Sequence, residues 1–468
     1  MKDKIIAGAI VLVSLALGYG WMSESSASAP QPELRKPGAD ISGNIFRSTT
    51  QSKLSKPELR KGSGVAADIP GSWPCFRGPN RDGVNTENIP LARSWSASGP
   101  PKLWSVSVCQ GYAGAAVLGG KVYLLDYDET NLADALRCLS LDDGAEIWRY
   151  SYPVCVKPNH GITRTVPAAS ENYVVAMGPK CHVYCVKAQS GEPLWSLDLA
   201  KEFKTAEPAW YAGQCPLLDG EKAILAPGNE ALLIAVDCAS GKILWKTPNP
   251  HNWKMTHASI LPAEFGGQKM YVYCGDGGVA GVSAADGKVL WETDGWRVST
   301  ATVPTPVDMD GGRIFLTGYY DAGALLLQLK DNGGKISAEP GFHLKSQLFG
   351  SYQQTPIFCQ DCLYGILPGP DSQLVCLDLK GNQLWSSKEI RFGKQGGGPY
   401  LLAQGLLYAL DDDGLLTLLE VSKTGCRQLA QAKVLDGVES WGPMALAGGR
   451  LLVRDLTHMV CLDVRENR

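Results

Sequence analysis

Apolar and polar residues alternate along much of this chain in short runs separated by turns. Period-two alternation is typical of half-buried β-strands, and glycine in a turn allows the positive φ that tight hairpins need. The pattern therefore predicts antiparallel hairpins. Five segments combine an apolar strand, a Gly-containing turn and a second strand ending in Trp: RCLSLDDGAEIW (137–148), YCVKAQSGEPLW (184–195), IAVDCASGKILW (234–245), AGVSAADGKVLW (280–291) and VCLDLKGNQLW (375–385).

These hairpins recur with a nearly constant period. Successive tryptophans from Trp148 to Trp291 lie 47, 50 and 46 residues apart, and the next gap of 94 residues, to Trp385, spans two units. Phe342 stands near the place of the missing Trp. Two more short strands precede each hairpin, as in TVPAAS and YVVAMG. Four strands in a repeat of this length predict the blade of a β-propeller.

The number of inner strands gives the number of blades. We therefore predict an all-β fold, a single eight-bladed propeller of four-stranded antiparallel blades covering residues 71–468. The last blade lacks its outer strand, which GPPKLWSVSV (99–108) would supply, so the N-terminal strand closes the ring by pairing with C-terminal strands. The inner strands start near Ala113, Thr165, Gln214, His257, Thr305, Thr355, Pro399 and Pro443.

The tryptophan that ends a hairpin carries a large apolar ring, which can cover the neighbouring sheet. We therefore expect a structural docking role for this set of residues. It comprises Trp104, Trp148, Trp195, Trp245, Trp291 and Trp385.

The N-terminal residues 1–29 read as a targeting segment. Lys2 and Lys4 precede an apolar run, Ile5 to Trp21, and small polar residues follow it. This order is typical of a secretory signal peptide, and the length of the run also allows an uncleaved membrane anchor. Residues 30–70, rich in Pro, Ser, Lys and Gly, predict a disordered linker. We expect an exported protein of the periplasm or cell envelope, tethered if the anchor remains.

The segment WPCFRGPNRDGVN (73–85) stands at the start of the ordered chain. Its two arginines, Arg77 and Arg81, and its Gly-Pro and Asp-Gly pairs suit either a ligand-binding loop or a structural clasp. Because it lies just ahead of the strand that closes the ring, the clasp is favoured.

The repeat also carries a family resemblance. Ala235, Asp237, Ser240, Gly241 and Trp245 match the tryptophan-docking motif, and the whole ordered chain resembles pyrroloquinoline-quinone (PQQ) type propeller repeat proteins. The resemblance implies a fold similar to quinoprotein alcohol dehydrogenases and to the propeller lipoprotein of the outer-membrane barrel-assembly machinery. Such dehydrogenases bind PQQ with calcium beside a disulfide between adjacent cysteines. This sequence has no Cys-Cys pair, so we predict no cofactor and keep PQQ with calcium as an alternative.

Charge and the remaining motifs exclude several function classes. The net charge of −3 gives no basic field for nucleic acid, and we expect a monomer. The carboxylate runs at 126–131, 308–312 and 411–414 are typical of turns, so no metal site is predicted.

Cys359 and Cys362 flank a predicted hairpin turn, which is not the setting of a redox motif. Most of the 14 cysteines are expected to be small buried hydrophobes, for example Cys138, Cys185, Cys238, Cys376 and Cys461.

The connections between blades should converge at one mouth of the ring, and they are rich in aromatic, basic and amide side chains. Two interpretations stay open: a recognition site, or a structural network that closes the blades. His160 or His257 could act as a base, but no catalytic pair is recognisable, and Cys215 and Ser259 are weak candidates as nucleophiles. The candidate ligand-binding residues are His160, Arg164, Trp210, Tyr211, Gln214, Lys254, His257, Tyr352, Gln354, Lys394 and Trp441.

The leading hypothesis is a non-catalytic binding or assembly platform in the cell envelope, with its ligand face at the mouth. Its partner would be an envelope protein or a small-molecule or carbohydrate ligand. The alternatives are a PQQ-dependent oxidoreductase and a carbohydrate-binding or carbohydrate-active propeller.

Overall fold

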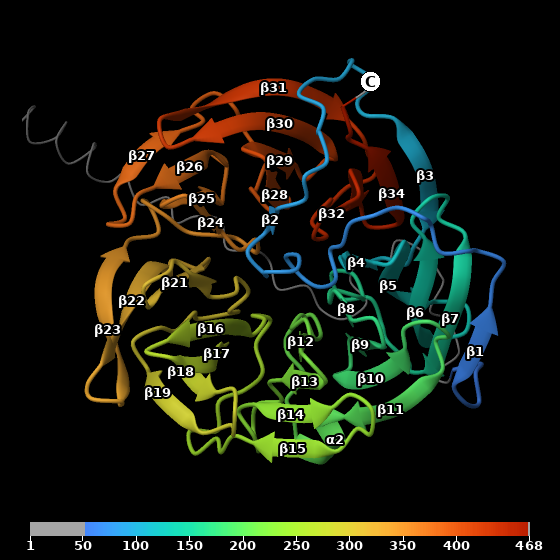
Figure 1. Cartoon of the computed structure of the whole chain (residues 1–468), viewed down its shortest axis with the longest axis horizontal. Coiled ribbons are helices and arrows are strands. Elements are labelled where there is room, and N and C mark those ends of the chain that lie inside the picture. The colour runs from blue at the N-terminus through green and yellow to red at the C-terminus, as the bar shows by residue number, and fades with distance from the viewer. Residues whose placement is uncertain (1–51, 467–468) are drawn as a thin grey trace, which may run out of the picture. The chain divides into compact units, whose positions relative to one another are not determined.

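Eight antiparallel sheets surround a central axis in the computed structural model, which describes residues 52–466 (Figure 1). The predicted signal or anchor at 1–29, and the predicted linker as far as residue 51, lie outside the described residues. The all-β, eight-bladed fold is confirmed. Among the described residues, no helix is both long and apolar enough to span a bilayer.

The first four blades each run from an inner strand at the axis to an outer strand at the rim. A short helix, α2 (Leu199–Phe203), follows the second blade. The strands, blade by blade, are β4 (Ala115–Leu118), β5 (Lys121–Asp128), β6 (Ala133–Ser140) and β7 (Glu146–Pro153); β8 (Ala168–Ala169), β9 (Tyr173–Met177), β10 (His182–Lys187) and β11 (Pro193–Asp198); β12 (Leu217–Asp219), β13 (Lys222–Leu225), β14 (Ile234–Asp237) and β15 (Ile243–Lys246); and β16 (Leu261–Phe265), β17 (Gln268–Gly275), β18 (Gly278–Ser283) and β19 (Val289–Thr293).

The next three blades follow the same order, and the eighth takes its outer strand from the N-terminal part of the chain. Their strands are β20 (Val307–Asp308), β21 (Arg313–Gly318), β22 (Gly323–Asp331) and β23 (Ile336–Leu344); β24 (Ile357–Cys359), β25 (Cys362–Ile366), β26 (Leu374–Leu377) and β27 (Gln383–Ser386); β28 (Tyr400–Ala403), β29 (Leu406–Leu410), β30 (Leu415–Ser422) and β31 (Gly425–Lys433); and β32 (Ala445–Ala447), β33 (Arg450–Arg454), β34 (His458–Asp463) and β3 (Lys102–Ser107).

The predicted ring closure is confirmed. Strand β3 pairs antiparallel with β34, which places Trp104 opposite Cys461. The largest group of contacting buried side chains joins blades 1 and 8 across this closure and includes Trp73 and Trp104. The two ends of the repeat array therefore share one core.

Side chains at the entrance to the inner strands link neighbouring blades in a ladder of hydrogen bonds. The N–H of Val166 donates to Cys215 Sγ at 3.2 Å, and the N–H of Cys215 donates to Ser259 Oγ at 3.0 Å. The ladder continues from Ser259 N–H to Thr305 Oγ1 at 3.1 Å and from Thr305 N–H to Thr355 Oγ1 at 2.9 Å. Each of these residues stands two positions before its inner strand. Buried backbone donors thus find acceptors on the next blade.

The corresponding positions in the other three blades are Gly398, Pro443 and Ala113, which have no side chain able to continue the ladder. An arginine takes over at the seam between blades 8 and 1. Arg454, 1% exposed, donates to the carbonyls of Ala113 and Cys109 at 3.0 Å each.

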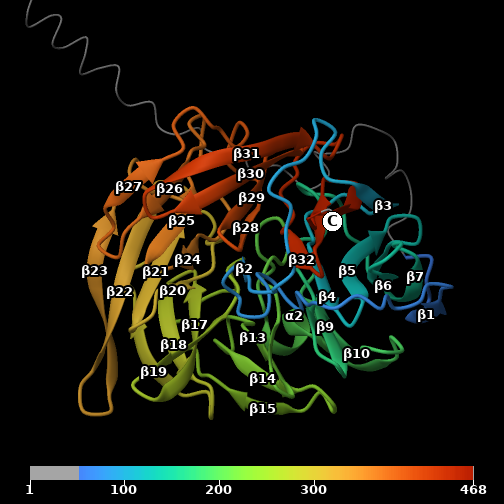
Figure 2. The same cartoon turned by 45° about the horizontal axis from the view of Figure 1, so that its top comes forward.

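Residues 71–85, called the clasp below, cross the ring at the axis (Figures 1 and 2). They bond to the inner part of six of the eight blades. The contacts are Trp73 with Val117, Pro74 with Ala169, Arg81 with Pro216, Arg77 with Thr355 and Pro356, Val84 with Leu402, and Asn85 with Leu446. The predicted clasp is therefore confirmed, and it extends well beyond the seam.

Arg77 is the best-bonded residue of the clasp. Its guanidinium donates to four carbonyls, those of Arg81, Asp82, Thr355 and Pro356, at 2.6 to 3.0 Å. Burial lowers its pKa to about 10, so the side chain remains charged at neutral pH. Because Thr355 ends the ladder, Arg77 supports the ring at the point where the ladder stops.

Four of the six tryptophans expected to dock share one contact with the following blade. The rings of Trp104, Trp148, Trp195 and Trp245 each cover a turn glycine of the following blade, at which a Cβ would come within 3.0 Å of the ring. The ring of Phe342 covers Gly381 in the same way, as its position in the repeat predicts.

The other two predicted tryptophans do not cover a turn glycine of the next blade. Trp385 still contacts that blade, because it donates to the carbonyl of Ser422 in blade 7 at 2.9 Å, as Trp104 and Trp195 donate to the carbonyls of Leu141 and Cys238. Trp291 packs on Gly281 of its own blade, with its indole nitrogen 3.3 Å from Met270 Sδ. A Cβ on Gly333 or Gly334, in the turn of blade 5, would meet nothing within 4 Å. The longer hairpin of blade 5 has thus lost the docking contact.

The prediction of a disordered linker as far as residue 70 is wrong for residues 58–61. These form β1 (Glu58–Lys61), which pairs antiparallel with β7 and makes blade 1 five-stranded (Figure 2). Composition missed this strand because an added edge strand needs backbone pairing more than an apolar face. Leu59, opposite Tyr150, is its one large apolar residue.

We expect Arg77→Met to lower the free energy of unfolding by about 3 kcal/mol, because four buried carbonyls lose a charged donor. Arg93→Met is the matched control, since Arg93 forms an exposed ion pair with Glu420 and should contribute less than about 1 kcal/mol. Urea unfolding measures both. Equal stability losses in the two variants would show that the clasp does not hold the ring.

Candidate functional site

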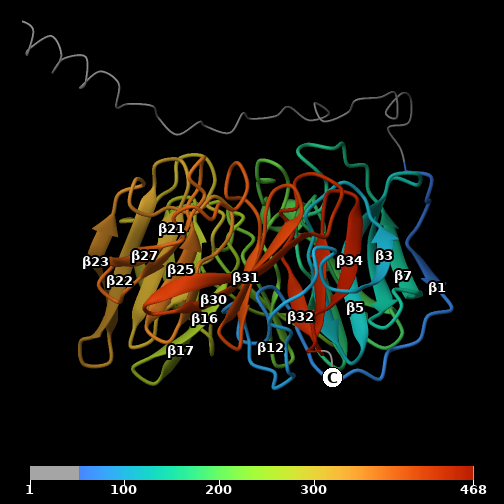
Figure 3. The ribbon, with the colours of Figure 1, turned by 90° about the horizontal axis from the view of Figure 1, so that it is seen from above.

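The mouth is the end of the ring at which the outer strand of each blade connects to the inner strand of the next. The clasp and the chain beside it contact the opposite end, at the hairpin turns that contain Gly120, Gln404 and Gly448. Figure 3 shows the ring from the side, with the C-terminal end of the last blade near these turns. The mouth is therefore the end that the clasp leaves uncovered.

Four mouth positions are equivalent by their place in the repeat. Arg164, His257, Gln353 and Trp441 each stand four residues before an inner strand. The ladder fixes the backbone just after the first three, whereas Pro443, at the same place after Trp441, takes no part in it.

Aromatic side chains from several connections pack into one cluster at the mouth. The ring of Tyr112 lies 5.5 Å from those of His160 and Trp441, and the rings of His160 and Trp441 lie 5.3 Å apart. Tyr352 contacts Trp441 at 6.0 Å and Tyr319 at 4.9 Å, both edge to face. Segments far apart in the sequence thus form one surface, called the mouth cluster below.

Charged groups border the mouth cluster. Tyr112 donates its hydroxyl hydrogen to Glu439 Oε2 at 2.5 Å, and His160 Nδ1 lies 4.0 Å from the same oxygen. The guanidinium of Arg164 lies 5.5 Å from the centre of the Tyr112 ring and donates to the carbonyls of Asn159 and His160. A cation and a carboxylate therefore contact the same aromatic ring.

Trp441 is fixed by a buried carboxylate. Its indole N–H donates to Asp412 Oδ1 at 2.6 Å, while Asp412 Oδ2 accepts from the N–H groups of Lys394 and Gln395. Gln354 donates from Nε2 to the carbonyl of Trp441 at 3.1 Å. The orientation of Trp441 is thus set by blade 7 and by the connection that leads into blade 6.

A second group at the mouth contains His257, Trp210 and Tyr211. His257 Nε2 lies 2.8 Å from the carbonyl of Ala209, and the Trp210 ring lies 6.2 Å from the imidazole. Burial, followed by the nearby charge of Arg164, lowers the pKa of His257 to about 4. The imidazole is neutral at physiological pH, so it donates a hydrogen to the carbonyl.

Three other predicted site residues belong to neither of these two groups. Gln214 is fully buried, and its amide bonds both the N–H and the carbonyl of Ala226, so it does not fit the predicted ligand contact. Its polar side chain serves the interior of blade 3, which the sequence pattern does not reveal. Lys254 and Lys394 are exposed, and Lys394 Nζ lies 3.7 Å from Asp413.

Sequence reasoning missed Tyr112, Glu439 and Asp412. The first two stand in the connecting segments CQGYAG (109–114) and GVESWGP (437–443), so their position in the repeat was the available signal. Asp412 belongs to a run correctly predicted as a turn, in which Asp411 accepts from the N–H groups of Asp413 and Leu415. A turn residue can orient a neighbouring blade's tryptophan only through the closed ring, which sequence does not show.

The side chains at the mouth do not fit a calcium–PQQ site. Calcium takes six to eight oxygen ligands, several of them carboxylates. The two carboxylates that contact the mouth cluster, Glu439 and Asp412, are already bonded to Tyr112 and Trp441. Within residues 52–466, no three His, Cys, Asp or Glu side chains are grouped so that they could hold a metal ion.

The two weak nucleophile candidates belong to the ladder. Cys215 and Ser259 accept backbone hydrogen bonds between blades, and burial raises the pKa of the Cys215 thiol to about 11. A thiol held this way is a poor nucleophile at neutral pH.

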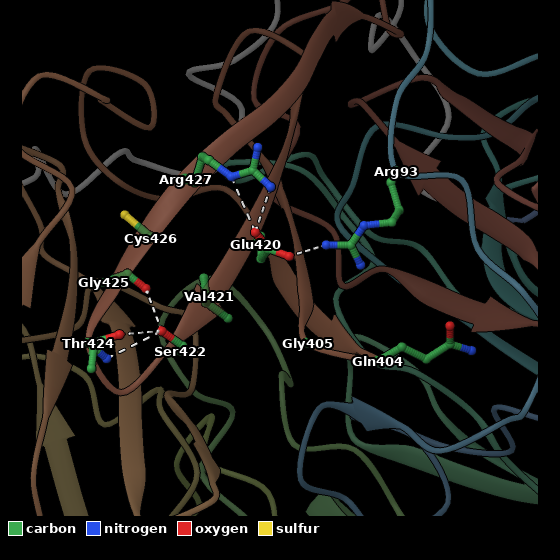
Figure 4. Close-up of a pocket in the computed structure, with 10 residues that line it drawn as sticks. All are labelled: Arg93, Gln404, Gly405, Glu420, Val421, Ser422, Thr424, Gly425, Cys426 and Arg427. Atoms are coloured by element: carbon green, nitrogen blue, oxygen red, sulfur yellow. Dashed lines mark hydrogen bonds and ion pairs between the residues drawn. The ribbon is translucent and has the colours of Figure 1, made fainter.

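A separate hollow lies at the rim of blade 7 (Figure 4). Arg93 and Arg427 both pair with Glu420, and Ser422 contacts Thr424 and Gly425 in the turn. Because one carboxylate serves two arginines, the hollow carries excess positive charge. Its exposed ion pairs and turn bonds are those of an ordinary hairpin end, so we place the candidate site at the mouth.

The family model described as "Outer membrane protein assembly factor BamB" matches residues 132–387. No curated protein sequence matches the chain significantly. Among solved structures, BamB from Moraxella catarrhalis aligns with a TM-score of 0.53 at 15% identity, covering 78% of this chain and 100% of that one. A europium-containing methanol dehydrogenase aligns at 0.56 and 14% identity, covering 84% and 91%. The computationally designed Ika8 protein aligns at 0.52 and 11%, covering 78% and 100%.

These similarities to solved structures establish the fold, since all three identities are low. The three similar structures are a BamB protein, a methanol dehydrogenase and a designed protein, so the same fold occurs with different functions. Function has to be inferred from the mouth.

We expect His257→Gln to remove part of the pH dependence of stability. The native pKa of about 4 lies below the ordinary value of 6.5, so the unfolded chain binds more protons between these values. The contribution of His257 is complete above pH 6.5 and is lost as the pH falls towards 4. Because the side chain is half-buried, the effect should be about 1 to 2 kcal/mol.

Thermal unfolding between pH 4 and 7 measures this difference. His257→Gln should lose less stability than the wild type on acidification, because the amide can still donate to Ala209. Parallel curves for His257→Gln and the wild type would contradict the assignment of a neutral, buried imidazole.

Proposed function

The chain belongs to the PQQ-type propeller family whose model is described as outer membrane protein assembly factor BamB, and we propose that it is a non-catalytic binding or assembly platform of the cell envelope. Its ligand face is the mouth. The partner is an envelope protein that contacts the mouth cluster.

The mouth cluster is the observation that carries this proposal. Side chains from four separate connections, Tyr112, His160, Tyr352 and Trp441, contact one another and are bordered by Arg164 and Glu439. Aromatic residues and arginine are enriched where proteins bind each other, because they bury large areas with little loss of conformational freedom. Preorganised side chains lower the entropic cost of association further.

The protonation behaviour of the mouth supports binding over proton transfer. An efficient general base or acid has a pKa close to the working pH. Burial instead lowers the pKa of His257 to about 4 and raises the pKa of the Tyr352 hydroxyl well above its ordinary value. Both groups stay neutral across the physiological range, as constant hydrogen-bonding partners.

The oxidoreductase alternative has less support. The fold is shared with a methanol dehydrogenase, but the mouth carboxylates are already bonded and the sequence has no Cys-Cys pair. The carbohydrate alternative requires exposed aromatic faces on which a sugar ring could lie. Tyr112 and Trp441 are 8% and 7% exposed, so they offer a sugar ring no open face. The half-buried His160 and Tyr352 are the members of the cluster that a protein partner can contact directly.

The family and the N-terminal residues support the proposed location in the cell envelope. The name of the family model refers to the outer membrane, and the predicted signal or anchor at 1–29 would export the chain. An exported platform can meet its partner without entering the bilayer itself.

A photo-crosslinking amino acid placed at Tyr352 should link the full chain to an envelope protein in intact cells. The same group at Val289, an exposed position on the rim strand β19, is the matched control and should give no such product. Arg164→Ala should reduce the Tyr352 crosslink several-fold, because the Arg164 guanidinium borders the cluster. Equal crosslinking at both positions would contradict a ligand face at the mouth.

Incubation of the purified chain with PQQ and calcium should leave the quinone absorbance spectrum that of the free cofactor. Dye-linked oxidation of primary alcohols should remain at the rate of the no-protein control. Bound quinone with turnover would overturn the non-catalytic proposal in favour of the oxidoreductase.

A further inference from the structure

Two cysteines face each other across a tight turn in blade 6. Cys359 ends β24, Cys362 begins β25, and the two residues are direct partners in the strand register. Gln360 and Asp361 between them have φ values of 52° and 59°, as a two-residue hairpin turn requires. Among the strands that the structure describes, this is the one register pair made of two cysteines.

We propose that Cys359 and Cys362 form a reversible disulfide across this turn, which makes the hairpin a site of redox modification. Opposite residues of antiparallel strands have Cα atoms about 4.5 to 5.5 Å apart, within the range of about 4.4 to 6.8 Å seen in disulfides. Their Cβ atoms, at about 4.5 to 5.5 Å, must approach slightly to reach the usual spacing of about 3.8 Å. A bond that needs this adjustment is readily reduced again.

The two cysteines differ in their exposure to solvent. Cys359 is half-buried and lines a surface hollow together with Asn85 and Thr86 of the N-terminal segment and with Gln404 and Gly405 of blade 7. Cys362 is 1% exposed and lies beneath the hairpin. An oxidant therefore reaches Cys359 first, and Cys362 completes the exchange from within.

The oxidant that the proposal names is a disulfide, either a small molecule such as oxidised glutathione or a protein disulfide. The Cys359 thiolate attacks one sulfur of the oxidant, forms a mixed disulfide and releases one thiolate. The Cys362 thiolate then attacks the Cys359 sulfur, forms the Cys359–Cys362 bond and releases the second thiolate. Two protein thiols are oxidised, the oxidant disulfide is reduced, and the two protons pass to the released thiolates.

The surroundings favour slow modification over catalysis. Burial, then the negative charge of Asp82 and the neighbouring Cys362, raises the pKa of the Cys359 thiol. Catalytic redox cysteines have the opposite environment, with a cation or helix N-terminus that lowers the thiol pKa. The pair is thus suited to equilibrate with its redox surroundings over minutes to hours.

A third thiol offers an internal competitor. Tyr364 is the register partner of Cys376, so Cys376 lies diagonal to Cys362 on the same face of the blade. The Cys362 and Cys376 side chains are hydrogen-bonded, so the competing thiol lies close to Cys362. Diagonal residues have Cα atoms about 7 to 8 Å apart, beyond the range of about 4.4 to 6.8 Å seen in disulfides, so the backbone spacing favours the direct partner Cys359. Only one of the two disulfides can form at a time.

The test equilibrates the purified full chain with oxidised and reduced glutathione in varied ratio, then alkylates it in denaturant and maps the cysteines by peptide mass. Oxidising buffers should give a peptide two hydrogens lighter in which Cys359 and Cys362 are not alkylated, and reducing buffers should restore both thiols. Cys376→Ser should leave this result unchanged. Cys426, half-buried at the rim of blade 7 (Figure 4), is the lone-thiol control and should form no intramolecular disulfide.

Cys359→Ser should leave Cys362 as a thiol in every buffer, and the wild type serves as the reference if this variant folds poorly. The proposal is overturned if Cys359 and Cys362 both remain thiols in fully oxidising buffer. It is also overturned if the recovered bond joins Cys362 to Cys376.

Discussion

The inner strands of the eight blades converge on one axis, where each blade has to satisfy buried backbone donors with acceptors from the next blade. Five blades are linked by four side-chain acceptors, from Cys215 to Thr355, at the same position of each repeat. The other three blades have Gly, Pro or Ala there, and arginines act at two points of the ring. Arg454 bonds blade 8 to blade 1, and Arg77 reaches in from the clasp to the carbonyl of Thr355, where the ladder ends.

This constraint also arranges the mouth. Arg164 and His257 stand two residues before Val166 and Ser259, so the contacts that link the blades fix the backbone of this part of the ligand face. The clasp occupies the other end of the axis. A partner therefore meets a preformed surface at one end of the ring, and a chain that lost the ladder would lose the mouth as well. Stability and recognition are coupled through the same few residues.

The repeat was predictable because its physics is local. Each unit contains its own turn glycine and its own tryptophan, and even Phe342 could be placed from the period alone. The burial of several cysteines was also predictable. Opposite the tryptophans a small residue lets the indole ring lie on the sheet, and these positions hold the buried Cys138, Cys185, Cys376 and Cys461.

The non-local contacts could not be predicted in the same way. The bond from Tyr112 to Glu439 joins residues 327 positions apart, and the Asp412 contact with Trp441 joins a turn of blade 7 to the connection into blade 8. Its place at the end of a connection and its amide side chain predicted Gln214 at the mouth, whereas its amide completes the interior of blade 3. Strand β1 was missed because pairing at the edge of a sheet does not require a distinctive amino-acid composition. Sequence identified the connections that form the mouth, and only the closed ring shows which side chains meet there.

Amide hydrogen exchange of the full chain, resolved to single residues, tests most directly whether the ladder and the clasp hold the ring together. The N–H groups of Val166, Cys215, Ser259 and Thr305, and that of Trp73 in the clasp, should exchange as slowly as those in the inner strands, because all of them should open only when the ring does. Fast exchange at these five residues beside well-protected inner strands would show that the blades close without them, and would contradict this account.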